Sequence, residues 1–259
     1  MRRRLLYGAL LPVACSIAAA VAVQAQQDLR SAMNARLDAL ANRVAWAAFV
    51  NRFPERFPPA ASTSGDGVVH AEEEDFELGG RHFAVGIGYR QVLIRAPLAR
   101  VRRMLSSPDL FKDLYGLDAD ATVGGLTGDR IEREHVREFR ARILKRLPVL
   151  PDQDYMLRYS GSDDGPAWFQ RVRLVEDLEG FALRANLQVL EPVNGGVVLR
   201  SISMLYPRDW LVRALTTQIR AVTRTELAKM NATERCAAEN PAPRLTPAIA
   251  AACWAQASR

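Results

Sequence analysis

The feature that most constrains the fold is a strand that ends at a proline and is followed by a long helix. Residues 197–206 (VVLRSISMLY) alternate in the manner of a β-strand, and Pro207-Arg208-Asp209 interrupts that pattern. The next segment, Trp210–Met230, is apolar along one side only and predicts an amphipathic helix. A helix of about 21 residues that follows a run of antiparallel strands has to lie across their sheet. This arrangement predicts a hollow between helix and sheet.

The residues before this unit predict further strands and short helices. Gly86 and Gly88 lie on one face of the first strand, where another element or a ligand can come close. The charged segment 130–146 is typical of an exposed edge strand or strand pair. The order of elements predicts an α+β fold with helices on one face of an antiparallel sheet. The clearest predicted elements are strand His82–Arg95, helix Leu98–Leu105, and strands Tyr155–Ser160, Ala167–Val175, Phe181–Leu190 and Val197–Tyr206.

The N-terminus has the features of a targeting segment. Arg2–Arg4 are followed by the apolar run Leu5–Val23, and Val23-Gln24-Ala25 has the small residues of a cleavage site. Residues 1–25 are therefore interpreted as a signal peptide or an N-terminal membrane anchor, and a lipoprotein signal at Cys15 stays open as a third reading. All three export the remainder, which predicts a periplasmic or secreted protein, held at the inner membrane if the segment is an anchor.

Cysteine usage agrees with export. Cys236 and Cys253 bracket a proline-rich stretch that turns the chain back on itself, which predicts a disulfide. It would close a loop of about 18 residues and stabilise the fold by about 3 kcal/mol. Two unpaired thiols in a tail are the alternative. The pair lacks CxxC spacing and a neighbouring histidine, so neither metal binding nor redox catalysis is expected.

Composition shifts divide the exported part into three regions. Residues 26–81 are expected to hold an amphipathic helix over Asp28–Phe49 and then a linker rich in Pro, Ser and Gly. Residues 82–232 form the main domain. Residues 233–259 form a proline-rich tail with the disulfide.

Three segments of the main domain resemble the START-like (StAR-related lipid transfer) superfamily. Val92–Val101 (VLIRAPLARV) is similar to the first strand and helix of that family. Leu147–Arg158 (LPVLPDQDYMLR) is similar to its proline-preceded strand, with Gln153 where the family often has arginine. Leu190–Arg200 (LEPVNGGVVLR), with the helix after Pro207, resembles its closing hairpin and lid helix. The resemblance implies the helix-grip fold, a curved antiparallel sheet wrapped around a long C-terminal helix. It implies fold more than function, since the superfamily includes lipid carriers, hormone receptors, polyketide cyclases and quinone-binding proteins.

The predicted pocket is lined by alternating strand residues on one side and by the apolar arc of the helix on the other. Two polar positions stand out. Glu226 falls inside the apolar arc and Arg200 alternates with apolar neighbours, so they would orient a headgroup or pair with each other. A solvated Glu226 and an outward-facing Arg200 are the alternatives. The residues predicted to bind the ligand are Trp168, Val172, Leu183, Leu187, Arg200, Ile202, Leu211, Leu215, Ile219, Val222 and Glu226.

Charge and motifs exclude several functional classes. The net charge is +6, but three of the positive charges are Arg2–Arg4, and a concentrated basic face for nucleic acid is lacking. The sequence contains no HExxH, GxSxG or P-loop motif, and its three histidines are scattered. No catalytic residue, metal or cofactor is therefore predicted.

The sequence favours an exported carrier that binds a lipid or other hydrophobic small molecule, for lipid transport or sequestration, with a membrane surface as partner. Burying an acyl chain of about 16 methylenes is worth roughly 13 kcal/mol before entropy losses, so such a ligand needs little polar recognition. Two alternatives stay open. One is a cyclase- or hydrolase-like enzyme using Glu226 or His135 in the same cavity, and the other is a membrane-tethered adaptor without ligand. The protein partner is not predicted.

Overall fold

The structure is a computed structural model that describes residues 24–60, 63, 65–107, 110, 113–115, 123–124, 135–143, 153–176, 182–207 and 216–259. Within these ranges, the side chains of residues 123–158, 175–176, 182, 216–219 and 222 are outside the description. The predicted targeting segment falls almost entirely on residues 1–23, also outside it. None of the helices in the described part of the chain is long and apolar enough to cross a membrane.

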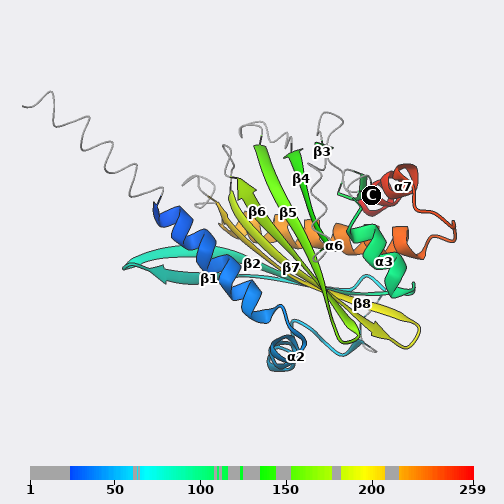
Figure 1. The fold of residues 1–259 in the computed structure, drawn as a ribbon, viewed down its shortest axis with the longest axis horizontal. Helices are drawn as coiled ribbons and strands as arrows, with labels where there is room; N and C mark the ends of the chain where they lie inside the picture. Colours follow the sequence, from blue (N-terminus) through cyan, green and yellow to red (C-terminus); the bar gives the residue numbers. More distant parts are fainter. Residues whose placement is uncertain are drawn as a thin grey trace, which may run out of the picture.

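A single antiparallel sheet of eight strands forms the body of the protein (Figure 1). Neighbouring strands are ordered β1-β2-β8-β7-β6-β5-β4-β3, so the last strand in sequence pairs with β2 near one edge. The strands are β1 (Val68–Leu78), β2 (Arg81–Ile94), β3 (Val123–Gly124), β4 (His135–Ile143), β5 (Gln153–Asp164), β6 (Ala167–Glu176), β7 (Ala182–Val193) and β8 (Gly196–Pro207).

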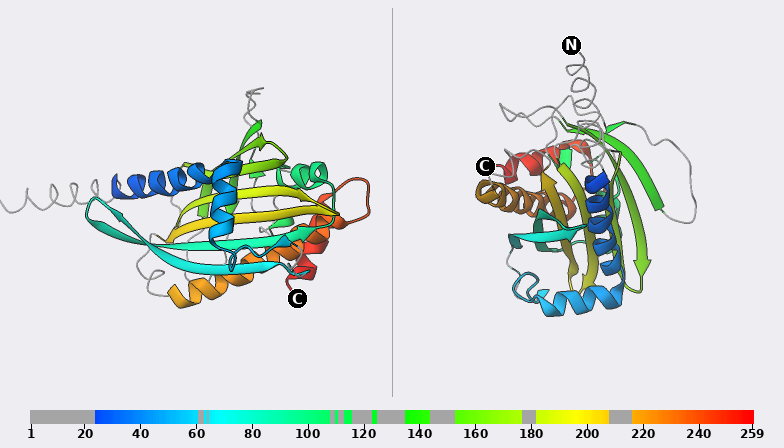
Figure 2. Two further views of the ribbon diagram at one scale, coloured as in Figure 1. Left: turned by 90° about the horizontal axis from the view of Figure 1, so that it is seen from below. Right: turned by 90° about the vertical axis from the view of Figure 1, so that its left-hand side faces the viewer.

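Helices cover both faces of this sheet (Figures 1 and 2). The N-terminal helix (residues 24–40) and α2 (Arg43–Arg52) lie on one face, which we call the outer face. On the other, inner face lie α3 (Leu98–Leu105) and the 24-residue helix α6 (Thr216–Glu239), with α7 (Pro247–Ala257) beside α6. The α+β class and the helix-grip layout are therefore confirmed.

The structure differs from the sequence-based boundaries at three places. The helix expected over Asp28–Phe49 is two helices, because Asn42 accepts a hydrogen bond from the amide of Ala45 and caps α2. The expected linker contains strand β1, which pairs with β2 along its whole length. The long helix continues from Met230 to Glu239, into the expected tail.

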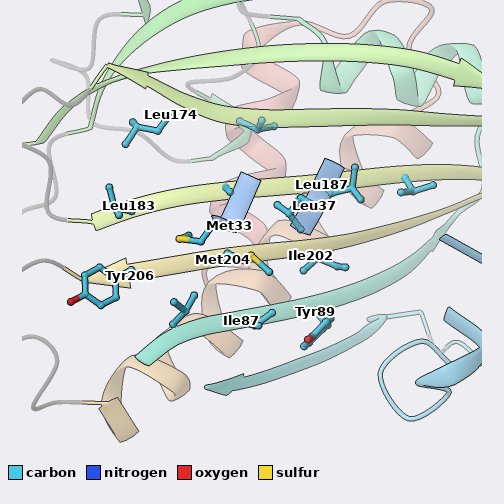
Figure 3. Packing of buried hydrophobic residues seen from close by; sticks show 14 of the residues in the cluster. Met33, Leu37, Ile87, Tyr89, Leu174, Leu183, Leu187, Ile202, Met204 and Tyr206 are labelled. Atoms are coloured by element: carbon cyan, nitrogen blue, oxygen red, sulfur yellow. The ribbon is translucent and has the colours of Figure 1, made fainter. Parts of the chain in front are cut away.

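An apolar layer joins the N-terminal helix to the outer face (Figure 3). Leu29, Met33 and Leu37 recur every four residues, so they lie on one side of the helix and are at most 3% exposed. Met33 and Leu37 point toward the sheet, where they meet apolar side chains from β2, β7 and β8. These strand residues are Ile87, Tyr89, Leu183, Leu187, Ile202, Met204 and Tyr206.

The C-terminal end of α6 is held at several points. The predicted disulfide is present: Cys236 of α6 and Cys253 of α7 are joined, with 5.6 Å between their Cα atoms. Arg100 of α3 donates hydrogen bonds of 2.6–2.8 Å to the carbonyls of Ala238, Asn240 and Ala242. The last carbonyls of a helix lack intrahelical partners, so Arg100 satisfies the end of α6 and fixes it to α3.

Candidate ligand-binding site

Four predicted ligand-binding residues lie on the outer face, away from α6. Leu183, Leu187 and Ile202 belong to the cluster that includes the N-terminal helix. Arg200 alternates in phase with Ile202 on β8 and also faces outward. The expectation that they face α6 is therefore corrected. The sequence pattern shows which residues share a sheet face, but it does not show which helix covers that face.

Arg200 and Glu226 are not paired. Arg200 donates a hydrogen bond of 2.6 Å to Oε1 of Gln91 and forms an ion pair with Glu191. Glu226 instead lies 3.3 Å from Nζ of Lys229, and its side chain is 39% exposed. The outward-facing Arg200 and the solvated Glu226, the two alternatives considered from the sequence, describe the structure.

Trp168 and Val172 of β6 face inward. Trp168 is buried in the cluster that contains α3, and the Arg102 guanidinium lies 5.6 Å from the centre of its ring. Val172 alternates with Arg171 and Arg173, which both contact Asp38 of the N-terminal helix, and it pairs with Asn186 in the row that includes Gly88, so it points inward. It is buried and also packs at the margin of the apolar cluster that includes the N-terminal helix. The predicted residues Leu211 and Leu215 lie outside the described residues, as do the side chains of Ile219 and Val222.

Polar residues form a row across the inner face, one from each of four adjacent strands. In strand order they are Arg90, Ser201, Gln188 and Gln170, and each is the direct cross-strand partner of the next. All four are buried. The neighbouring row toward the first half of α6 is Gly88, Ser203, Asn186, Val172 and Tyr159.

Arg90 is the centre of a buried network that joins the sheet to α6. Its Nη2 donates to Glu234 at 3.0 Å, its Nη1 donates to Glu234 and Asn231, and its Nε donates to Ser201 at 2.9 Å. Arg90 and Glu234 are both fully buried. Burial alone would lower the pKa of Arg90, but the Glu234 carboxylate outweighs burial and raises it. Arg90 is therefore a fixed positive charge that links the sheet to α6.

Tyr115 extends the network toward β7. Its hydroxyl donates to Oε1 of Glu234 at 3.0 Å and is also hydrogen-bonded to Gln188. Burial, with the nearby Glu234 carboxylate, raises the pKa of Tyr115 above its usual range. The hydroxyl therefore stays protonated at ordinary pH.

The first half of α6 comes close to the sheet at Gly88. A Cβ atom at this glycine would lie 2.6 Å from Cδ1 of Leu227 and 3.3 Å from Cγ2 of Thr223. Asn186 and Ser203, across the sheet from Gly88, are partly exposed. The candidate site is this part of the inner face, with the Arg90–Glu234–Tyr115 network at its closed end.

The described side chains of the site are mainly apolar groups and amides. Among the described residues, no group of His, Cys, Asp or Glu side chains is placed to hold a metal ion. The buried ionisable groups of the network are committed to one another. What remains is an apolar surface, including Leu227 and Val172, beside side-chain amides.

Sequence reasoning missed Arg90, Glu234 and Tyr115. Glu234 lies beyond Met230, where the predicted helix ends. The spacing of Leu227, Asn231, Glu234 and Ala238 would have shown one continuous helix face.

Comparisons with known proteins gave structural similarities only. No protein-family model matches the chain, and no curated protein matches it. The human StarD13 (DLC2) lipid transfer and protein localization domain is similar, with 14% identity, 62% of this chain and 87% of that chain covered, and a TM-score of 0.45. A STAR-related lipid transfer protein fragment from Xanthomonas axonopodis has 15% identity, 63% and 99% coverage, and a TM-score of 0.40. Norcoclaurine synthase from Thalictrum has 13% identity, 64% and 95% coverage, and a TM-score of 0.35.

Proposed function

We propose that this chain is an exported protein that binds a lipid or another hydrophobic small molecule between α6 and the inner face of the sheet. The observation that carries the proposal is the half-open contact between them. At Gly88 the helix touches the sheet, while Asn186 and Ser203 on the same row stay partly exposed. An apolar ligand on this surface gains about 0.8 kcal/mol for each buried methylene.

The two halves of α6 differ in how firmly they are held against the sheet. The second half is fixed by Arg90, by Arg100 and by the disulfide. Near the first half, Arg220 and Arg224 are exposed, and Asn186 and Ser203 of the sheet are partly exposed. A ligand therefore enters near the first half of α6 without breaking the buried network.

Two observations support export. Arg2–Arg4 with the apolar run Leu5–Val23 has the pattern of a signal segment or anchor. The Cys236–Cys253 disulfide suits an oxidising compartment. We place the protein in the periplasm or outside the cell, where it carries or sequesters its ligand near a membrane surface.

The test is to purify the protein from its native host, extract it with organic solvent and analyse the extract by mass spectrometry. We expect a lipid-like molecule in about one-to-one ratio with the protein. The variant Ser203→Phe fills the site and should lose it, whereas Thr225→Phe on the exposed side of α6 should retain it. A wild-type protein that carries no such molecule and binds none from a broad lipid panel would refute the proposal.

A further inference from the structure

In the part of the chain that the structure describes, three side-chain amides on the inner face have oxygens without a hydrogen-bond partner. They are Oε1 of Gln170, Oε1 of Gln188 and Oδ1 of Asn186, and all three atoms are buried. Gln170 and Gln188 are direct cross-strand partners, and Asn186 is two residues before Gln188 on β7. Their spacing follows from strand geometry, about 5 Å across the strands and about 7 Å along them. The three amide side chains therefore start from neighbouring positions of the inner face.

The surrounding bonds fix which end of each glutamine is free. Nε2 of Gln170 donates to the main-chain carbonyl of Leu105 at 3.3 Å, and a carbonyl can only accept. Gln188 is bonded to the Tyr115 hydroxyl, whose own proton goes to Glu234, so Gln188 contributes its nitrogen there. Rotating either amide would lose a bond. Nδ2 of Asn186 donates to Oγ of Ser203 at 2.9 Å, which leaves its Oδ1 as the free atom. The free atoms are acceptors, and their natural partners are O–H or N–H donors.

The charge of the region also restricts the ligand. The one buried cation of the polar row, Arg90, already donates to Glu234, Asn231 and Ser201. At the described polar row, an anionic headgroup would meet amide oxygens and the Glu234 carboxylate, and Arg90 is already paired there. A neutral group with donors avoids this repulsion and satisfies buried acceptors that are unfavourable when left alone.

We infer that the ligand of the inner face is a neutral amphiphile whose polar end carries hydroxyl or amide N–H donors, and that Asn186, Gln188 and Gln170 select it. The inference rests on the proposed function and adds the class of ligand. Asn186 is partly exposed and is reached first. Gln188 and Gln170 lie deeper, and their bonds to Tyr115 and Leu105 use the amide nitrogens, so donors of a ligand pair with the oxygens without breaking these bonds.

Three probes with the same acyl chain separate the possibilities. Monolauroylglycerol has two hydroxyl donors, methyl laurate has none, and laurate is an anion. Each would be used below its solubility limit or micelle concentration to displace the apolar dye N-phenylnaphthylamine from the purified full-length protein. We expect monolauroylglycerol to bind about tenfold more tightly than methyl laurate, and laurate to bind no better than the ester.

Variants assign this preference to residues. Gln188→Met and Gln170→Met should each weaken monolauroylglycerol binding by about tenfold and leave methyl laurate unchanged. Gln91→Met is the control, because Gln91 is a buried glutamine of the outer face with both amide ends bonded. It should leave the preference intact. Asn186→Leu removes the partly exposed amide of the three. In the same assay it should also reduce the preference for monolauroylglycerol over methyl laurate.

The outcomes distinguish the inference from the proposed function. Equal affinity for the three probes, or tightest binding of laurate, would overturn the inference while the apolar site stands. Variants that weaken the ester and the glycerol compound equally would also overturn it, because they would show a role in shape alone. A wild-type protein that binds neither dye nor any probe would refute both.

Discussion

The outer and inner faces of the sheet use the same strands and differ in what they bury. On the outer face, Ile87, Leu187 and Ile202 meet Met33 and Leu37 of the N-terminal helix in a sealed apolar layer. On the inner face, the same strands present Arg90, Gln188 and Ser201, and α6 supplies Glu234. The strand residues that alternate most regularly as hydrophobic therefore lie on the outer face, which the N-terminal helix covers. The more polar face is the one that meets α6 and carries the candidate site.

The largest expected effect comes from the buried ion pair of the inner face. Glu234→Gln leaves the Arg90 guanidinium buried without its counter-charge, and the free energy of unfolding should fall by about 3–5 kcal/mol. Urea unfolding followed by circular dichroism measures this change. Asp163→Asn removes the partly exposed pair with Arg102 and should change it by less than about 1 kcal/mol. Similar values for both variants would contradict the assigned importance of the buried pair.

The outer face should lose stability through packing. Leu37→Ala removes a side chain that is 3% exposed between the N-terminal helix and the sheet, and a loss of about 3 kcal/mol is expected. The same unfolding experiment measures it. Ligand binding should be unchanged, because Leu37 faces away from α6. A variant with normal stability but impaired binding would reverse the roles given to the two faces.

Two glycines of β2 test how closely α6 approaches. Gly88→Ala places a Cβ 2.6 Å from Leu227 and should lower the free energy of unfolding by about 1–2 kcal/mol and alter ligand affinity. Gly86→Ala, on the same face of the same strand, meets its nearest neighbour at an ordinary 3.5 Å. The comparison uses thermal unfolding together with dye binding. Equal effects of the two substitutions would show that α6 does not press on Gly88.

A smaller effect on the free energy of unfolding is expected at high pH. It comes from two buried tyrosines, one on each face of the sheet. Burial raises the pKa of Tyr115 on the inner face, and burial with the Glu72 bond raises that of Tyr89 on the outer face. Above about pH 10 the unfolded chain releases these protons while the folded chain keeps them, so stability falls as pH rises. Tyr115→Phe and Tyr89→Phe should each flatten this fall, by at most about 1.4 kcal/mol per pH unit. Unfolding midpoints between pH 9 and pH 11 measure it, and a slope unchanged in both variants would contradict the assignment.

Most of the fold could be predicted from the sequence. Helix α3 lies over the predicted residues, strands β6, β7 and β8 lie within a few residues of their predicted bounds, and the Cys236–Cys253 disulfide is present. Strand β1 was missed because its acidic run Glu72–Asp75 has the composition of a linker. The acidic side chains of this run alternate between the two faces of β1. On one face, Glu72 pairs with Arg56 and Glu74 with Arg36. On the other face, Glu73 and Asp75 are exposed.

The site was less predictable than the fold. The alternation along a strand shows which residues share a face of the sheet, but it does not show which helix covers that face. The N-terminal helix covers the face that was expected to line the pocket. Of the predicted residues with described side chains, Trp168 and Val172 are on the inner face. The Arg90–Glu234 pair joins residues 144 positions apart, a contact that single-sequence patterns do not encode.

The most direct test of the central claim is an NMR measurement of which face holds the ligand. Methyl-labelled protein bound to monolauroylglycerol should show intermolecular nuclear Overhauser effects to Leu227 and Val172 on the inner face. Leu37, Leu187 and Ile202 on the outer face should show none. Effects confined to Leu37, Leu187 and Ile202 would contradict the account and place the ligand under the N-terminal helix.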